Sequence, residues 1–143
     1  MSTYGSKTDA EQIAKDLHSQ IEGKIILTTG VTPGGLGASF VNVVAAHSPK
    51  LLILAGRNLA KVSDTAAAVT KETGVATRAL ELDLASQQAV RKAAAEVNGW
   101  SDVEVIDVLM NNAAIMAAPY SKTVDGLESQ FGTNHIVSTL VDK

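Results

Sequence analysis

The chain has 143 residues, of which 45% are hydrophobic and 19% are charged, and this size and composition predict one globular domain with a single core. Its 12 Lys and Arg residues are outnumbered by 15 Asp and Glu residues, and a net charge of −3 argues against nucleic acid as a partner. The absence of cysteine excludes disulfides and Cys-based zinc sites, and the lack of a long apolar run or a signal-peptide pattern argues against a membrane partner and favours a cytoplasmic location.

An amphipathic helix is predicted ahead of the main domain. Thr8 and Glu11 have the spacing of a capping box. Apolar residues follow at intervals of four: Ile13, Leu17 and Ile21. We therefore expect residues 1–20 to form a helical extension that packs outside a dinucleotide-binding domain at residues 21–143.

Segments typical of strands and helices then alternate along the chain. Apolar runs predict strands at residues 25–27, 51–55, within 75–84, and at 103–110. Helical spacing predicts a helix after each strand, with the apolar faces Leu36, Phe40, Val43 and His47; Leu59, Val62, Ala66 and Val69; Val90, Ala94 and Val97; and Leu127 and Phe131.

Capping residues mark several helix ends. Gly74 is suited to end the second of these helices, Ser86 to cap the third and Asn98-Gly99 to end it. Asp125, with Glu128 three residues later, predicts the start of the last helix.

The alternation predicts an α/β fold, a Rossmann-type doubly wound parallel sheet built from right-handed βαβ crossovers. The run Val108-Leu109-Met110 agrees with a strand that is buried on both faces. The six-strand order of such sheets is predicted only as far as its fourth strand, so we expect a domain that is truncated at its C-terminal end. The strand at residues 103–110 would then have an unpaired edge, and we expect self-association through it, moderated by Asp102, Glu104 and Asp107.

A glycine-rich turn between the first strand and the first helix is the main functional signal. It reads Thr29-Gly30-Val31-Thr32-Pro33-Gly34-Gly35-Leu36-Gly37. Glycines allow close backbone approach to phosphate, and a helix N-terminus favours anions, so the turn predicts a dinucleotide pyrophosphate site. A tight turn without a ligand is the alternative. No Lys-Ser or Lys-Thr follows the last glycine, so the turn is not a Walker A loop.

Arg57 is the candidate for cofactor choice. It stands at the end of the second strand, where an NAD-preferring site normally has Asp or Glu. Its guanidinium is suited to a 2′-phosphate, which predicts NADP as the cofactor, with NAD less favoured. A solvated turn residue is the alternative interpretation of Arg57.

The chain resembles the classical short-chain dehydrogenase/reductase family, in particular its retinol-dehydrogenase-like and WW-domain-oxidoreductase-like branch and the fungal members. Segments in family order carry the resemblance: Thr29-Gly30 with Gly35-Leu36-Gly37, Ala55-Gly56-Arg57-Asn58, Asp83-Leu84, Asn111-Asn112-Ala113-Ala114 and Phe131-Gly132-Thr133-Asn134-His135. The resemblance implies an oxidoreductase that transfers a hydride between NADP and a small-molecule carbonyl or alcohol.

The resemblance also implies a role for individual residues. Gly30, Thr32, Gly35, Leu36 and Gly37 would surround the pyrophosphate and its ribose, Arg57 and Asn58 the adenosine ribose phosphate, Asp83 and Leu84 the adenine, and Asn112, Ala113 and Ala114 the nicotinamide ribose. Asn111 would brace the sheet. An equal alternative for Asn111 and Asn112 is a structural role, in which their side-chain amides bind backbone groups that have no partner at the strand end.

Asn134 matches the Asn of the family's catalytic Asn-Ser-Tyr-Lys tetrad. The resemblance implies that Asn134 is catalytic and holds a water in the proton relay to the active-site Lys. Its spacing from Leu127 and Phe131 places it on the apolar stripe of the last predicted helix, where an amide needs hydrogen-bond partners. A local cap near a helix end is the alternative.

The chain departs from the family pattern in several places. Four residues separate Gly30 from Gly35 where the family has three, and Ala114 stands where the family has Gly. The sequence after Ile136 offers no Tyr-x-x-x-Lys, and Tyr120-Ser121-Lys122 has the wrong spacing. The alternative function is therefore a truncated, catalytically inactive nucleotide-binding fragment; a redox-sensing regulator is disfavoured because Asn134 is retained. No metal site is predicted, because the three histidines are far apart in sequence: His18, His47 and His135.

Overall fold

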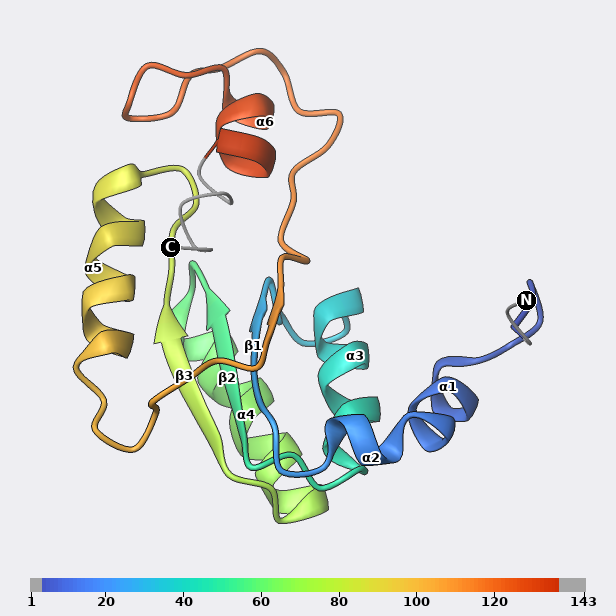
Figure 1. Ribbon diagram of the computed structural model, residues 1–143. Coiled ribbons are helices and arrows are strands. Elements are labelled where there is room, and N and C mark those ends of the chain that lie inside the picture. Colours follow the sequence, from blue (N-terminus) through green and yellow to red (C-terminus); the bar gives the residue numbers. More distant parts are fainter. Residues whose placement is uncertain (1–3, 137–143) are drawn as a thin grey trace.

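A parallel sheet of four strands forms the centre of the computed structural model, which describes residues 4–136 (Figure 1). The strands are β1 (Ile25–Thr29), β2 (Leu51–Gly56), β3 (Thr77–Glu81) and β4 (Val108–Met110). They pair in the order β3-β2-β1-β4, and every pairing is parallel. This confirms the predicted fold class, a Rossmann-type α/β sheet with the first four strands of the doubly wound order. The predicted extension and main domain each include residues outside the described range, 1–3 and 137–143.

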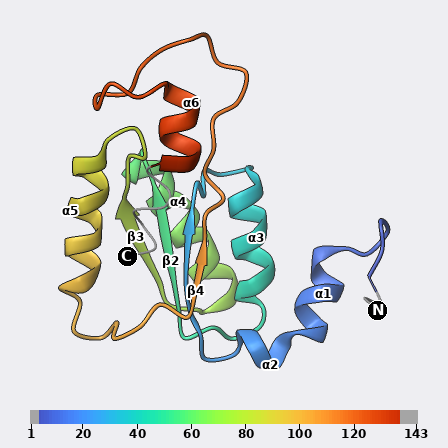
Figure 2. The ribbon, with the colours of Figure 1, turned by 45° about the horizontal axis from the view of Figure 1, so that its top comes forward.

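Helices cover both faces of the sheet (Figure 2). They are α1 (Ala10–Asp16), α2 (His18–Ile21), α3 (Leu36–Ala45), α4 (Leu59–Thr73), α5 (Gln87–Asn98), α6 (Ser129–Phe131) and the π-helical turn η1 (Gly132–Ile136). Side chains of α3 and α4 pack on one face of β1 and β2, and side chains of α5 pack on the other. The central strand β2 is fully enclosed, since Leu52, Ile53 and Leu54 are completely buried. No helix in residues 4–136 is both long enough and apolar enough to cross a membrane.

Local capping signals predicted several helix ends correctly. Gly74 ends α4 with a φ of 76°, as predicted, whereas the N-cap of that helix, Asn58, which accepts from the Lys61 amide, was not predicted. Ser86 caps α5 by accepting from the Ala89 amide, as predicted. The ends at Gly74 and Ser86 were predictable because each depends on contacts within a few residues of chain.

The predicted N-terminal helix is two short helices. Asp9, not Thr8, is the N-cap of α1, because its carboxylate accepts from the Gln12 amide at 2.8 Å. The helix ends at Leu17, whose φ and ψ of −98° and 14° are not helical, and α2 begins at the next residue. Figures 1 and 2 show both helices beside the lower end of α3.

The predicted apolar face of α3 is wrong. Its buried residues are Gly37, Ala38, Val41, Val44 and Ala45, whereas Leu36 is 85% exposed. Small side chains let this helix approach the sheet closely, so burial does not follow the largest apolar residues.

The last two predicted elements are shorter than expected. β4 covers only Val108–Met110, and Val108 and Met110 are 41% and 37% exposed, so the prediction of a strand buried on both faces is wrong. The reason is that β4 is the edge strand of the described sheet. The N-cap of the last helix is Glu128, whose carboxylate accepts from the amides of Gln130 and Phe131. The predicted start, Asp125, instead accepts from the Gln87 amide of α5.

Candidate functional site

Two glycines of the turn after β1 are required by close packing inside the protein. Gly30 has a φ of +75°, and a Cβ there would lie 2.8 Å from the Cα of Ala113. A Cβ at Gly37 would lie 2.6 Å from both the Asn112 Nδ2 and the Gly30 carbonyl oxygen. Both glycines therefore bring the turn against the segment that follows β4, and this packing requires no ligand.

The N-terminus of α3 lies at the end of this turn. Its N-cap is Gly35, and among the residues that the structure describes no side chain caps the helix, whose first turn has no acidic residue. Amide groups at a helix N-terminus have no intrahelical acceptor and carry partial positive charge, which favours an anion. Gly34 and Gly35 place no side chain directly before this end, so the N-terminus of α3 is chemically suited to a phosphate.

Asn112 fastens the end of β4 to the end of β1. Its Nδ2 donates to the Thr29 carbonyl at 2.9 Å and to the Gly30 carbonyl at 3.2 Å. The Ala113 amide also donates to the Thr29 hydroxyl at 3.0 Å. Asn112 thus satisfies backbone groups at the strand ends, which is the alternative predicted for the pair Asn111-Asn112.

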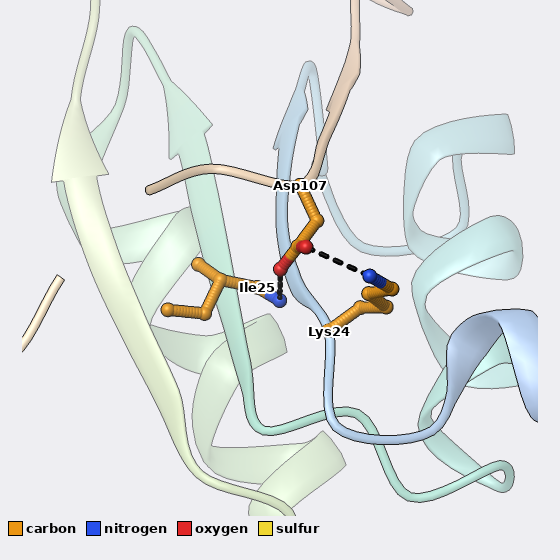
Figure 3. Close-up of polar contacts among 3 residues, drawn as sticks. All are labelled: Lys24, Ile25 and Asp107. Atoms are coloured by element: carbon orange, nitrogen blue, oxygen red, sulfur yellow. Dashed lines mark hydrogen bonds and ion pairs between the residues drawn. The ribbon is translucent and has the colours of Figure 1, made fainter. Parts of the chain in front are cut away.

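Asp107 fixes the opposite end of β4 (Figure 3). Its Oδ2 accepts from the Ile25 amide at 2.8 Å and its Oδ1 from the Lys24 Nζ at 2.9 Å, and its own amide donates to the Ile25 carbonyl. The hydrogen bond from Ile25, together with that from Lys24, lowers the pKa of Asp107 below its usual value. Asp107 and Asn112 therefore set the position of β4 along β1.

A cleft of about 460 Å³ lies at the carboxyl ends of the strands. Its lining includes nine of the predicted cofactor residues: Gly30, Thr32, Leu36, Arg57, Asp83, Leu84, Asn112, Ala113 and Ala114. The structure therefore brings together residues from four separate segments of the chain. The other three predicted residues, Gly35, Gly37 and Asn58, are not among the lining residues.

Arg57 stands at the cleft directly after β2. Its side chain is exposed, and within residues 4–136 its guanidinium has no hydrogen bond or ion pair. Arg78 differs, since it binds Asp102 through two hydrogen bonds and lies over the ring of Trp100. The guanidinium of Arg57 is therefore available to an anion in the cleft.

Two neighbouring positions are partly occupied by local contacts. The side chain of Asn58 uses its oxygen to cap α4, as described above. The Asp83 Oδ1 accepts from the Ala85 amide at 2.9 Å, while Leu84 is buried. These contacts hold the chain at the edge of the cleft after β2 and β3.

Asn134 lies in the π-helical turn η1, which directly follows α6 in the chain. Figure 2 shows α6 beyond the carboxyl ends of the strands. Its Oδ1 accepts from the Ile115 amide at 2.8 Å and its Nδ2 donates to the Ile115 carbonyl at 2.7 Å. The side chain therefore joins η1 to the loop after β4, and it does not line the cleft, whereas Ile115 and Thr133 do. Single π-helical turns are frequent at functional sites.

Sequence reasoning missed six of the lining residues: Thr29, Ala55, Gly56, Leu82, Ile115 and Thr133. Most of them stand at or just after the carboxyl end of a strand. Because ligands of open α/β sheets bind outside these ends, the strand boundaries alone were the signal that could have identified them.

Comparisons with known proteins agree with this architecture. The family model described as short chain dehydrogenase matches residues 24–135. The chain is 30% identical over 142 residues to "Oxidoreductase fscI" of Fusarium equiseti and 32% identical over 145 residues to retinol dehydrogenase 13 of Homo sapiens. These matches cover 98% and 95% of this chain but 54% and 43% of the relatives, so the chain spans about half the length of the curated relatives it matches.

Solved structures of similar fold include two with nicotinamide cofactors. A short-chain dehydrogenase from Sphingobium yanoikuyae in complex with NADPH has a TM-score of 0.68 and 25% identity, covering 83% of this chain and 45% of that chain. NAD+-bound xylitol dehydrogenase has a TM-score of 0.68 and 26% identity, covering 85% of this chain and 46% of that chain. These two similar proteins carry different nicotinamide cofactors.

Proposed function

The chain belongs to the short-chain dehydrogenase family, and from this premise we propose that its strand-end cleft is the NADP site of an oxidoreductase. The observation that carries the proposal is the cleft itself. It combines a helix N-terminus, an arginine and a carboxylate, contributed by the segments after β1, β2 and β3. Among residues 4–136, no side chain caps that helix and no acidic group pairs with the arginine. This arrangement is suited to the phosphates at one end of a dinucleotide and to the base beside them.

The residues of the cleft divide between the parts of the cofactor. The amides at the N-terminus of α3 would bind the pyrophosphate. Because Gly34 and Gly35 have no Cβ, the pyrophosphate could approach the backbone closely there. The Asp83 carboxylate would accept from the adenine amino group. Ala113 and Ala114 would line the nicotinamide ribose at the end of β4. The nicotinamide supplies or accepts the hydride, and these residues only orient it.

Arg57 supports NADP over NAD. Its guanidinium lies at the cleft without an acidic partner in residues 4–136, and a planar guanidinium binds phosphate oxygens in a bidentate manner. An NAD site instead has an acidic residue that binds the 2′-hydroxyl. The solved structures of similar fold include one with NADPH and one with NAD+, so the fold alone does not decide between the two cofactors. The preference for NADP therefore rests on Arg57.

For the whole protein, we propose hydride transfer between NADP and a small-molecule carbonyl or alcohol. Such a reaction needs a proton donor at the carbonyl oxygen. The two tyrosines of the sequence, Tyr4 and Tyr120, are followed four residues later by Thr8 and Val124 in place of a lysine. We therefore propose that these 143 residues by themselves bind the cofactor and do not catalyse the reaction. A cytoplasmic location stays a prediction from the sequence.

A variant at the N-terminus of α3 tests whether the cleft binds the cofactor. Leu36 is the first residue of this helix and is 85% exposed, so Leu36→Asp places a carboxylate where the pyrophosphate would bind while remaining favourable for the helix. Calorimetric titration with NADPH should show binding by the unsubstituted chain and at least a tenfold weaker affinity for Leu36→Asp.

The matched control is Ala10→Asp, which adds the same charge at the first position of α1. It should bind NADPH as tightly as the unsubstituted chain. A chain that does not bind NADPH, or a Leu36→Asp variant that binds it unchanged, would contradict the proposed function.

A further inference from the structure

Two histidines that are 29 residues apart in sequence meet beside the sheet. His18 begins α2, and His47 follows the end of α3. Their Nδ1 atoms are 3.3 Å apart, and the two rings are inclined at 64° with centroids 5.5 Å apart. The distance between these histidines in the chain does not keep them apart in the fold, because α1 and α2 lie beside α3 (Figure 1).

The distance between the two nitrogens has the value that a shared metal ion requires. Zn²⁺ binds histidine nitrogens at about 2.0–2.1 Å, and two ligands of one tetrahedral ion at that length are about 3.3–3.4 Å apart. The two Nδ1 atoms, which form a hydrogen bond with each other at 3.3 Å, therefore have the separation of two ligands of such an ion. The ion would take the place of the proton between them.

Glu22 supports the same interpretation from the other side of His18. Its Oε2 lies 3.7 Å from the His18 Nε2, one helical turn along the chain. Metal-binding histidines usually have a carboxylate or carbonyl beside the ring nitrogen that does not bind the metal, where it orients the ring. His18 and Glu22 have side chains that are 47% and 63% exposed, so water is available to complete the coordination.

We propose that His18 and His47 form a two-nitrogen site for a divalent transition metal, with Glu22 as the carboxylate behind His18. Imidazole ligands select Zn²⁺, Ni²⁺ or Cu²⁺ over Mg²⁺ and Ca²⁺. In residues 4–136, no group of three or more His, Cys, Asp or Glu side chains is placed to hold a metal, so water supplies the remaining ligands and binding is modest in strength. Bound metal would tie α2 to the end of α3 and stabilise the folded chain.

The test is metal titration of the 143-residue chain without a histidine tag. NiCl₂ and ZnCl₂ should bind and raise the thermal midpoint, MgCl₂ should do neither, and EDTA should reverse the shift. His18→Gln and His47→Gln should each weaken Ni²⁺ binding at least tenfold, and Glu22→Gln should weaken it by a smaller factor. His135→Gln is the matched control, since His135 lies in η1 against Phe131 and should leave the affinity unchanged.

A spectroscopic measurement keeps the proposal testable if a variant does not fold. Electron paramagnetic resonance of Cu²⁺ added to the unsubstituted chain should show two coordinating nitrogens. Binding that His18→Gln and His47→Gln leave unchanged, a Cu²⁺ signal with one nitrogen, or no binding of Ni²⁺ or Zn²⁺ would overturn the proposal. The histidine pair would then be a hydrogen bond between the two rings and nothing more.

Discussion

The side-chain amide of Asn112 donates to the backbone carbonyl of Gly30 at 3.2 Å, and this hydrogen bond joins the segment after β4 to the turn after β1. The same contact explains why Gly37 has no side chain, because a Cβ there would lie 2.6 Å from the Asn112 Nδ2. The geometry of the turn therefore depends on a residue 82 positions further along the chain.

Asn112→Ala should lower both the stability and the cofactor affinity. The substitution removes the hydrogen bonds to the Thr29 and Gly30 carbonyls. A buried carbonyl that loses its donor lowers the free energy of unfolding by about 1–3 kcal/mol. Urea unfolding followed by circular dichroism measures the loss. Asn42→Ala, at an exposed position on α3, is the control and should change the stability by about 0.5 kcal/mol at most. Equal stabilities of the two variants would show that the bracing contact is unimportant.

Asp107→Asn should destabilise the chain in a manner that depends on pH. Because the hydrogen bonds from Ile25 and Lys24 lower the pKa of Asp107, its contribution is fully present above the unfolded-state pKa of about 3.9. The contribution is lost as the pH falls below that value through the lower pKa of the folded state. The free energy of unfolding of the unsubstituted chain should therefore exceed that of Asp107→Asn by a constant amount between about pH 5 and about pH 7, where the carboxylate is ionised in both states. This difference should shrink as the pH falls toward about pH 3.

Asp64→Asn, an exposed carboxylate of α4, is the control for Asp107→Asn, since it reports the effect of losing a surface charge alone. Urea unfolding at several pH values supplies the measurement. A difference for Asp107→Asn that stays the same down to about pH 3 would show that its ionised carboxylate does not stabilise the end of β4.

We also propose that the isolated 143-residue chain associates through β4. Val108 and Met110 are exposed on this edge strand, and an apolar cavity of about 300 Å³, lined by Leu27, Val90 and Leu109 among others, opens beside it. Unpaired strand edges pair with other chains, and lysine on an edge prevents this. Size-exclusion chromatography with light scattering should show dimers or larger species, and Val108→Lys should shift them toward monomer. A monodisperse monomer of the unsubstituted chain would contradict this prediction.

The isolated chain should not oxidise or reduce any substrate. No tyrosine in its sequence has the lysine four residues later that would make it a proton donor, and Asn134 already uses both polar groups of its side chain on Ile115. The measurement is NADPH consumption with a panel of ketones and aldehydes. Turnover that persists through purification and is lost in Asn134→Ala would show that the chain has a catalytic group we have not identified.

Patterns within a few residues predicted much of this fold. The buried runs of β1 and β2, the glycine that ends α4 and the serine that caps α5 depend on local sequence, and each lies where the pattern placed it. The order β3-β2-β1-β4 followed from the alternation of strands and helices.

Features that depend on distant contacts were not predictable. Asp125 has the spacing of a helix cap but accepts from the Gln87 amide, because the fold brings its loop to the start of α5. His18 and His47 meet for the same kind of reason. In the site, motif spacing identified most of the lining residues and offered bracing of the strand ends as one of two roles for Asn112, and the packing shows which carbonyls it binds.

The central claim is that the strand-end cleft binds NADP and that Arg57 selects it, and the ratio of the NADPH and NADH dissociation constants tests this most directly. Calorimetry should show tighter binding of NADPH by the unsubstituted chain, and Arg57→Ala should weaken NADPH about tenfold or more while changing NADH little, since the lost contact is charge-assisted. Arg91→Ala, an exposed arginine on α5, should leave both constants unchanged. A ratio that Arg57→Ala does not alter would contradict the assignment of Arg57, and an unsubstituted chain that binds neither nucleotide would contradict the account of the cleft.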